Sequence, residues 1–135
     1  MLLVVDANIL FAAAIKDSKT AELMLSDKLE LIAPEYIFSE FNKYRAEILE
    51  KTERSPEDFE KFMFILWSRM SVIPHEETDD FITKAAVISP DPDDVQYFGL
   101  ALKHDCAIWS NDGRLKEQDN VKILTTEDLV KLLGL

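Results

Sequence analysis

Glycine, cysteine and basic residues are all scarce in this chain of 135 residues. Three glycines, with no GxxxxGK[ST] or GxGxxG pattern, exclude a glycine-rich phosphate-binding loop. A single cysteine, Cys106, excludes an internal disulfide and fits a reducing compartment. No apolar run approaches the roughly 20 residues of a membrane span, and no basic segment precedes Leu2–Val5 as it would in a signal peptide. We therefore expect a cytoplasmic protein that makes no contact with membranes.

The charge balance is strongly acidic. Asp and Glu number 26 against 15 Lys and Arg, which gives a net charge of −11. This balance disfavours nonspecific binding to nucleic acid, which draws on basic side chains. Part of the acidity could belong to a site that is neutralised only by a bound cation, and the rest to solvated helix faces. The 47% of hydrophobic residues suffices for one folded domain, expected to span residues 1–135.

Short apolar runs alternate with segments of helical periodicity along the whole chain. The candidate strands are Leu2–Val5, Leu31–Ala33, Ser71–Ile73, Ala107–Trp109 and Val121–Leu124. The expected helices run from Asp17 or Ser18 to Leu25, from Pro34 to Lys51, from a Ser55 cap to Met70, from Asp79 to Val87, from Asp93 to His104, and from Thr126 to Leu133. This alternation predicts an α/β fold with helices on both faces of a parallel sheet. Ligands of such sheets bind beyond the carboxyl ends of the strands.

Several carboxylates are expected at that edge. Asp6 directly follows the first strand, and Asp112 lies just beyond the strand Ala107–Trp109. Asp91, Asp93 and Asp94 begin the helix that leads into that strand, and Glu40 lies early in the helix after Leu31–Ala33. Carboxylates packed together repel and raise one another's pKa. Hard cations such as Mg²⁺ or Mn²⁺ compensate them, and the chemistry that follows is phosphodiester hydrolysis.

Three segments carry a family resemblance. Val4-Val5-Asp6-Ala7-Asn8-Ile9-Leu10 resembles the opening motif of PIN domains. Residues 94–102 and 108–112 resemble their third and fourth acidic motifs, and Glu40 fits the second acidic position. The resemblance implies a three-layer α/β/α fold with a five-stranded parallel sheet, Mg²⁺ or Mn²⁺ as cofactor, and RNA as substrate. It extends to VapC-like ribonuclease toxins, which small antitoxin proteins hold inactive.

The resemblance also implies roles for individual residues. By position, Asp6, Glu40, Asp94 and Asp112 would be the catalytic, metal-binding acids. Asn8 and Ser110 match polar positions that support such a site, and Asp91 would add a ligand or a hydrogen bond.

Simpler structural roles compete with these assignments. Asp6 and Asp91 could serve only as helix caps. Glu35 and Glu47 are alternatives to Glu40 on the same helical segment. Four basic residues near the proposed site could grip phosphates or be ordinary solvated charges: Lys43, Arg45, Arg114 and Lys116. The apolar stripe Phe59, Phe62, Met63, Leu66, Trp67 and Met70 is expected to be mostly core, with a homodimer or partner surface as the alternative.

Three functions remain open from the sequence. The leading hypothesis is a metal-dependent endoribonuclease, with the toxin of a toxin–antitoxin pair as its biological setting. The alternative is a PIN-like module that binds nucleic acid or protein without cutting. Phosphoryl transfer on a doubly wound sheet is a third class, but Asn8 replaces the second Asp of the Asp-x-Asp motif that haloacid-dehalogenase-like phosphatases need.

Overall fold

The fold is a five-stranded, fully parallel sheet covered by helices on both sides. The computed structural model describes residues 1–16 and 18–135, without the side chain of Ser18. The strands are β1 (Leu2–Val5), β2 (Glu30–Pro34), β3 (Met70–Ile73), β4 (Ala107–Trp109) and β5 (Ile123–Leu124). They lie in the order β3-β2-β1-β4-β5. All neighbouring pairs are parallel, as the sequence predicts.

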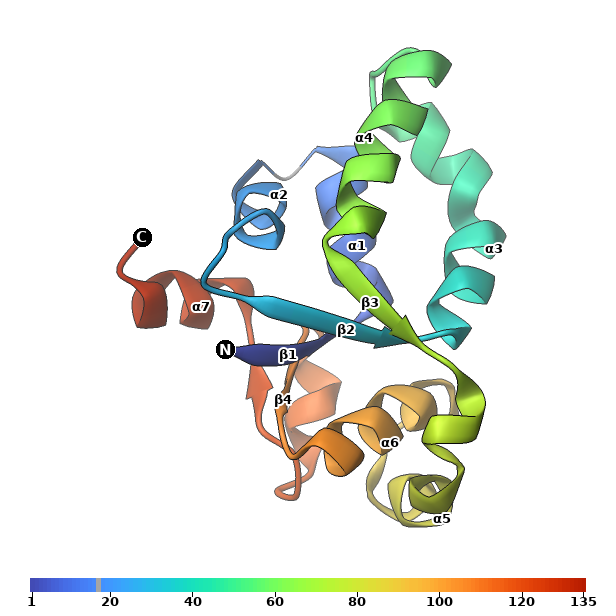
Figure 1. Ribbon diagram of the computed structural model, residues 1–135, viewed down its shortest axis with the longest axis vertical. Helices are drawn as coiled ribbons and strands as arrows, with labels where there is room; N and C mark the ends of the chain where they lie inside the picture. The colour runs from blue at the N-terminus through green and yellow to red at the C-terminus, as the bar shows by residue number, and fades with distance from the viewer. Residues whose placement is uncertain (17) are drawn as a thin grey trace.

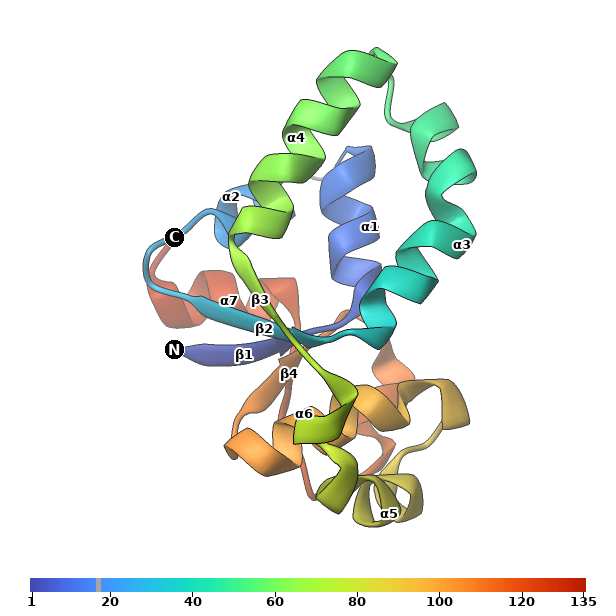
Figure 2. The ribbon, with the colours of Figure 1, turned by 45° about the vertical axis from the view of Figure 1, so that its right-hand side comes forward.

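The helices form the two outer layers. The α-helices of the described residues are α1 (Ala7–Ile15), α2 (Ser18–Met24), α3 (Tyr36–Lys51), α4 (Pro56–Ser68), α5 (Asp79–Ile88), α6 (Val95–His104) and α7 (Thr126–Leu133). Short 3-10 turns are η1 (His75–Glu77), η2 (Pro92–Asp94) and η3 (Gly113–Glu117). In Figure 1, α1, α3 and α4 lie above the sheet, and α5 and α6 lie below it. Figure 2 shows α1 standing between the two arms of the long α3–α4 hairpin.

The strand order places a crevice between β1 and β4. The chain runs outward from β1 through β2 to β3 and then returns to the other side of β1. At such a reversal the connections leave the two central strands toward opposite layers, which opens space beyond their carboxyl ends. Asp6 follows β1 and Ser110 follows β4, so both residues lie at the carboxyl ends of these central strands.

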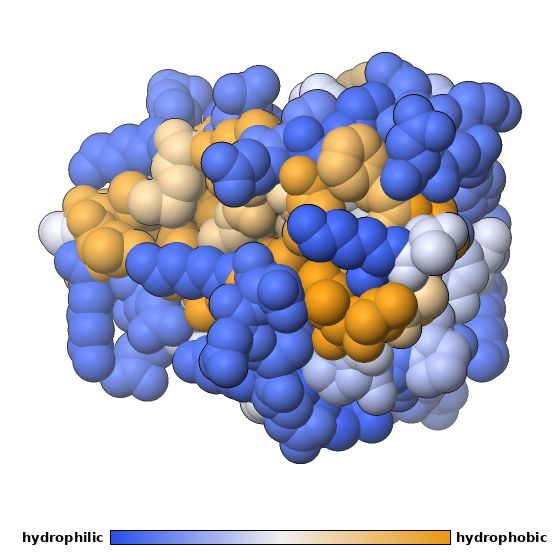
Figure 3. All heavy atoms as spheres, turned by 90° about the horizontal axis from the view of Figure 1, so that it is seen from below, coloured by the Kyte–Doolittle hydropathy of each residue, from blue (hydrophilic) through white to orange (hydrophobic). Residues whose placement is uncertain are grey.

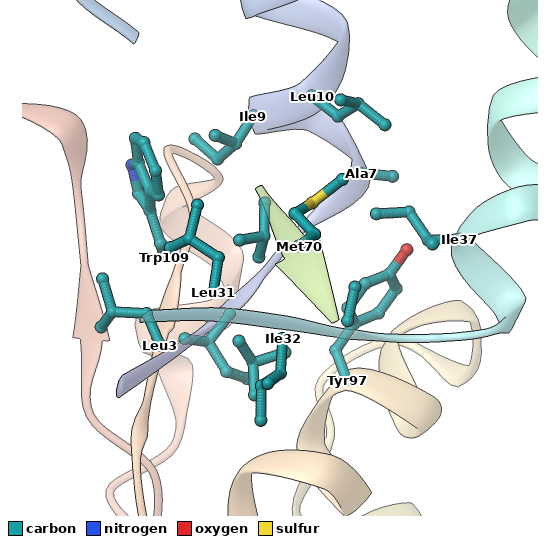
Figure 4. Close-up of a cluster of buried hydrophobic side chains, with 14 of the residues drawn as sticks. Leu3, Ala7, Ile9, Leu10, Leu31, Ile32, Ile37, Met70, Tyr97 and Trp109 are labelled. Carbon is teal, nitrogen blue, oxygen red and sulfur yellow. The ribbon is translucent and has the colours of Figure 1, made fainter. Parts of the chain in front are cut away.

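The core lies on both sides of β1, whose Leu3, Val4 and Val5 are fully buried. A strand buried on both faces reads as a continuous apolar run rather than an alternating one. Figure 4 shows the cluster that packs around it, with Ile9 and Trp109 on the α1 side of the sheet. Figure 3 shows the surface of the molecule from below, which is mostly hydrophilic with some apolar areas.

Two residues expected in helices belong to strands instead. Pro34, expected in the first turn of a helix, is the last residue of β2 and pairs with Ile73. Met70, expected at the end of the apolar helix stripe, begins β3 opposite Leu31. In both cases the pairing of β2 with β3 determines the backbone, and this pairing involves residues about 40 positions apart in sequence.

Two further boundaries differ from the expectation. The last strand is shorter than Val121–Leu124, because the Gln118 side chain binds both the N–H and the carbonyl of Val121 and so satisfies backbone groups that a strand would use. Helix α6 begins at Val95 rather than Asp93, after the 3-10 turn η2. Of the two residues expected to start the second helix, Ser18 begins α2, and Asp17 lies outside the described residues.

The apolar stripe of α4 is core. Its Phe59, Met63 and Leu66 are buried, as the sequence predicts. The large apolar side chains that α4 exposes belong to a different face, with Phe64 76% and Ile65 46% exposed. Phe62 and Trp67 of the stripe are only partly buried, and the homodimer stays a prediction. None of the helices in the described part of the chain has the length and apolarity to cross a membrane.

Candidate active site

Asp6 lies at the centre of the carboxyl edge. Its backbone has the extended geometry of an N-cap for α1, but its side chain makes no capping hydrogen bond. The carboxylate instead accepts a hydrogen bond from the Ser110 hydroxyl at 2.7 Å. Burial leaves Asp6 only 5% exposed and is the main cause of its raised pKa. The Ser110 hydroxyl and then the backbone N–H groups of Asn8 and Ala7 lower that pKa, while the negative charge of Asp112 raises it. The hydrogen bond with Ser110 gives this side chain a role other than capping.

Ser110 joins the ends of β1 and β4. Its hydroxyl donates to Asp6 and accepts a hydrogen bond from the backbone N–H of Asp112 at 3.0 Å. The residue is fully buried. The Asp6 N–H also donates to the Trp109 carbonyl at 3.1 Å, which extends the pairing of the two strands to this point. These bonds fix Asp6 and Asp112 relative to each other.

Asp112 is neutralised by its neighbour Arg114. One carboxylate oxygen accepts from the Arg114 backbone N–H at 3.0 Å, which caps the turn η3. The guanidinium donates to both carboxylate oxygens, at 3.3 Å from Nε and 3.0 Å from Nη2. These hydrogen bonds hold the pKa of Asp112 below its usual range. The guanidinium also reaches Asp91, with 3.6 Å between Nη1 and Oδ2.

Asp91 and Asp94 occupy opposite ends of the turn η2 and have different roles. The Asp91 side chain accepts a hydrogen bond from the Asp93 backbone N–H at 2.8 Å. Asp91 is therefore a helical cap, which was one of the two roles that the sequence left open. Asp94 makes no capping hydrogen bond to α6. Its pKa is raised to about 7, first by burial and then by the charges of Asp6, Asp91, Asp112 and Glu40. Asp94 is therefore the carboxylate that is least compensated in this arrangement.

Glu40 reaches the same place from α3. Its carboxylate accepts a hydrogen bond from the hydroxyl of Tyr97, which lies on α6 in the opposite layer. Burial raises the pKa of Glu40, and the charges of Asp6 and Asp93 raise it further, against the Tyr97 hydrogen bond and Lys43, which lower it. Glu35 does not line the cavity and binds the backbone of His75. Glu47 lines the cavity and pairs with Lys51. Glu40 is favoured over Glu47 because the charge of Asp6 acts on the Glu40 carboxylate.

One cavity of about 340 Å³ collects these side chains. The predicted site residues that line it are Asp6, Asn8, Glu40, Asp91, Asp94 and Asp112. Ser110 lies buried behind Asp6. Asp93 and Arg114 complete the polar wall. The cavity also has an apolar part between α1 and α3, formed by Phe11, Ile15, Tyr44 and Ile48.

Of the four candidate phosphate-binding residues, only Arg114 lines the cavity. Arg45 is paired with Glu60 on α4. Lys116 lies 3.8 Å from Asp128. Lys43 is close enough for its charge to lower the pKa of Glu40, although it does not line the cavity. Lys51, which the sequence reasoning did not single out, lies on the rim.

The donor set suits a hard divalent cation. All the acidic groups offer oxygen ligands, which Mg²⁺ and Mn²⁺ prefer. The raised pKa of Asp94 reflects burial first and then the negative charge of its neighbours, which a cation would offset. Among residues 1–16 and 18–135, no three His, Cys, Asp or Glu side chains are already grouped closely enough to hold an ion. Arg114 pairs with Asp112, and Tyr97 binds Glu40. Ligation through Asp112 would therefore require Arg114 to release that carboxylate.

A doubly wound α/β sheet with an acidic cavity at its switch point defines the class of this protein. Among protein-family models, the model of the PIN domain matches residues 4–133. The chain therefore belongs to the PIN domain family. Its fold is similar to that in the crystal structure of VapBC2 from Rickettsia felis bound to a DNA fragment from their promoter. The TM-score is 0.70 at 12% identity, over 93% of this chain and 98% of that chain. No curated protein matches the sequence.

Proposed function

We propose that this protein is a divalent-metal-dependent endoribonuclease. The observation that carries the proposal is the convergence of Asp6, Glu40, Asp94 and Asp112 on one cavity, from four separate parts of the chain. A fold gains no stability from gathering like charges, so such a cluster is more typical of a functional site than of a structural one. Membership of the PIN domain family supports the same reaction, since its members are typically nucleases.

The four acids would hold Mg²⁺ or Mn²⁺, with Asp91 as a further candidate ligand. When bound, the ion would activate water and stabilise negative charge on the phosphate. Ser110 would hold Asp6 and Asp112 in fixed relative positions through its two hydrogen bonds. Asn8 lines the cavity with an exposed side chain and could orient a water or a phosphate oxygen. Arg114, displaced from Asp112, would remain close enough to contact a phosphate next to the scissile bond.

A toxin–antitoxin setting is the proposed biological context. The structural relative is a VapBC complex, and the net charge of −11 suits a partner that brings Arg or Lys into the acidic cavity. Arg114 occupies such a position within the chain, against Asp112 and Asp91. A basic side chain from a partner would compete with the metal for the same carboxylates.

The second candidate function is a PIN-like module that binds RNA or protein without cleavage. Two observations favour it. The acids of the described residues are not yet grouped as metal ligands, and Arg114 already neutralises Asp112. Under this alternative the guanidinium would stay in the cavity, and the cluster would bind basic groups of a partner.

Cleavage of a single-stranded RNA with and without Mn²⁺ separates the two candidates. The wild-type chain should cut RNA with Mn²⁺ and not with EDTA. Asp6→Asn and Asp94→Asn should each lower the rate by more than about 100-fold, because a metal site contributes several kcal/mol to the transition state. Asp119→Asn is the matched control, since Asp119 is exposed and does not line the cavity. Its rate should equal that of the wild type.

Two results would overturn the assignment. If Asp6→Asn retains Mn²⁺-dependent cleavage, the catalytic role of the cluster is wrong. RNA binding without cleavage by the wild type would favour the second candidate. A DNA strand of the same sequence tests the preference for RNA.

A further inference from the structure

Tyr97 connects the two helical layers at the edge of the cavity. It lies on α6, one turn after Asp94, and is only 1% exposed. Figure 4 shows its ring rising from α6 past the end of β2, with the hydroxyl directed toward α3. That hydroxyl donates a hydrogen bond to Glu40. An uncharged residue of one layer thus holds a carboxylate that belongs to the other.

The ring is held firmly enough to act as a support. Tyr97 belongs to the buried core, and Tyr36 packs edge-on against it, with 6.5 Å between the ring centroids. A tyrosine hydroxyl is ordinarily protonated at neutral pH, so Tyr97 can donate a hydrogen bond. Tyr97 is therefore a hydrogen-bond donor from a fixed position.

Glu40 needs such a donor. Its flexible side chain has several rotatable bonds, and the charges of Asp6 and Asp93 repel it from the cavity. Lys43, an exposed residue one turn further along α3, attracts the Glu40 carboxylate as well. Without the Tyr97 hydroxyl, the carboxylate would lose the hydrogen bond that holds it against the repulsion of Asp6 and Asp93.

We propose that Tyr97 is a positioning residue that orients Glu40 toward the divalent cation. The inference rests on the proposed function, because it takes Glu40 as a ligand of that ion. Groups that hydrogen-bond to metal ligands fix the orientation of the ligand, and their removal typically weakens metal affinity 10- to 100-fold. Tyr97 lies within residues 94–102, the segment that resembles the third acidic motif, but it is not an acid, so a search for carboxylates does not find it.

Tyr97→Phe tests the proposal, since it removes the hydroxyl and keeps the ring. Calorimetric titration with Mn²⁺ should show about 10- to 100-fold weaker binding than in the wild type. Cleavage at saturating Mn²⁺ should return to within a few-fold of the wild-type rate. The matched control is Tyr36→Phe, which changes a tyrosine that packs against Tyr97 and belongs to the same helix as Glu40. Its Mn²⁺ affinity should be unchanged.

A double-mutant cycle separates positioning from packing. In a Glu40→Gln background, Tyr97→Phe should cause no further loss of Mn²⁺ affinity, because the carboxylate to be oriented is gone. An undiminished further loss would show that Tyr97 acts through the fold and would overturn the proposal. Wild-type affinity in Tyr97→Phe would overturn it as well, while leaving the nuclease assignment intact. If the wild type itself binds no Mn²⁺, both proposals fail.

Discussion

Two polar clusters flank helix α1, and they differ in how fully their groups are satisfied. At its start, Asp6 and the other carboxylates gather in an open cavity, and Asp94 has a pKa raised to about 7. At its end, Thr52 and Arg54 both donate hydrogen bonds to the Ala14 carbonyl, at 2.8 and 2.6 Å. Arg54 also donates to the Thr52 hydroxyl and stacks on the Phe62 ring, with its guanidinium carbon 3.9 Å from the centroid.

This difference indicates which of the two clusters stabilises the fold. The last carbonyls of a helix lack partners within the helix. Thr52 and Arg54 supply partners for Ala14 and join α1 to the α3–α4 connection, so this cluster is complete without any ligand. The acidic cluster leaves charge uncompensated, which costs stability, and a bound cation or a basic partner group would offset that cost. Removing a group should therefore have opposite consequences at the two ends of α1.

The largest effect on stability is expected at the Thr52 end. Thr52→Val removes one buried hydroxyl and should lower the free energy of unfolding by about 1 to 2 kcal/mol. The double variant Thr52→Val/Arg54→Met should lose about 3 kcal/mol, because the Ala14 carbonyl then has neither donor. Chemical denaturation measures both losses. RNA cleavage per folded molecule should stay at the wild-type rate, and a 100-fold loss would contradict the division between the clusters.

A smaller effect with the opposite sign is expected at the acidic end. The folded state raises the pKa of Asp94 to about 7, so the metal-free native state binds more protons than the unfolded state between about pH 4 and 7. The contribution of Asp94 to stability should therefore be fully present near pH 4, fall as the pH rises through 7, and level off above. The raised pKa values of Asp6 and Glu40 act in the same direction.

Asp94→Asn isolates this contribution. In EDTA, its free energy of unfolding should match the wild type near pH 4 and exceed it by on the order of 2 kcal/mol at pH 8. Thr52→Val is the control, because its loss of stability should be the same at both pH values. If Asp94→Asn is less stable than the wild type at pH 8, the cluster is not strained by its charges.

Local patterns were enough to predict most of the fold. Strands β1 and β4 occupy the predicted residues, because continuous apolar runs identify strands buried on both faces. The sequence patterns did not predict the extent of helix α1, although Asp6 was recognised as a possible cap for a helix that follows it. Its buried residues include Ala7, Ile9 and Ala13, which face several directions, so no amphipathic stripe marks it. Pro34, Met70 and Val121 were misassigned because partners distant in sequence or a neighbouring side chain decide their conformation.

The candidate site, like the fold, could be predicted from the sequence only in part. The positions of Asp6 and Asp112 follow from the ends of their strands, and parallel pairing brings strand ends to one edge. The predicted acids do line one cavity, while their catalytic roles stay predictions. The contact between Tyr97 and Glu40 depends on how α6 and α3 meet beyond the sheet, and the ion pair of Arg114 with Asp91 depends on the path of η3. No sequence spacing encodes either contact.

We propose that a divalent cation binds to the acidic cluster. Crystals soaked in Mn²⁺ and measured for anomalous scattering test this binding most directly. We expect an anomalous peak within the cavity, bounded by Asp6 and Asp94, with Arg114 turned away from Asp112. A cavity without a peak, with the guanidinium of Arg114 still bound to Asp112 and Asp91, would contradict the account.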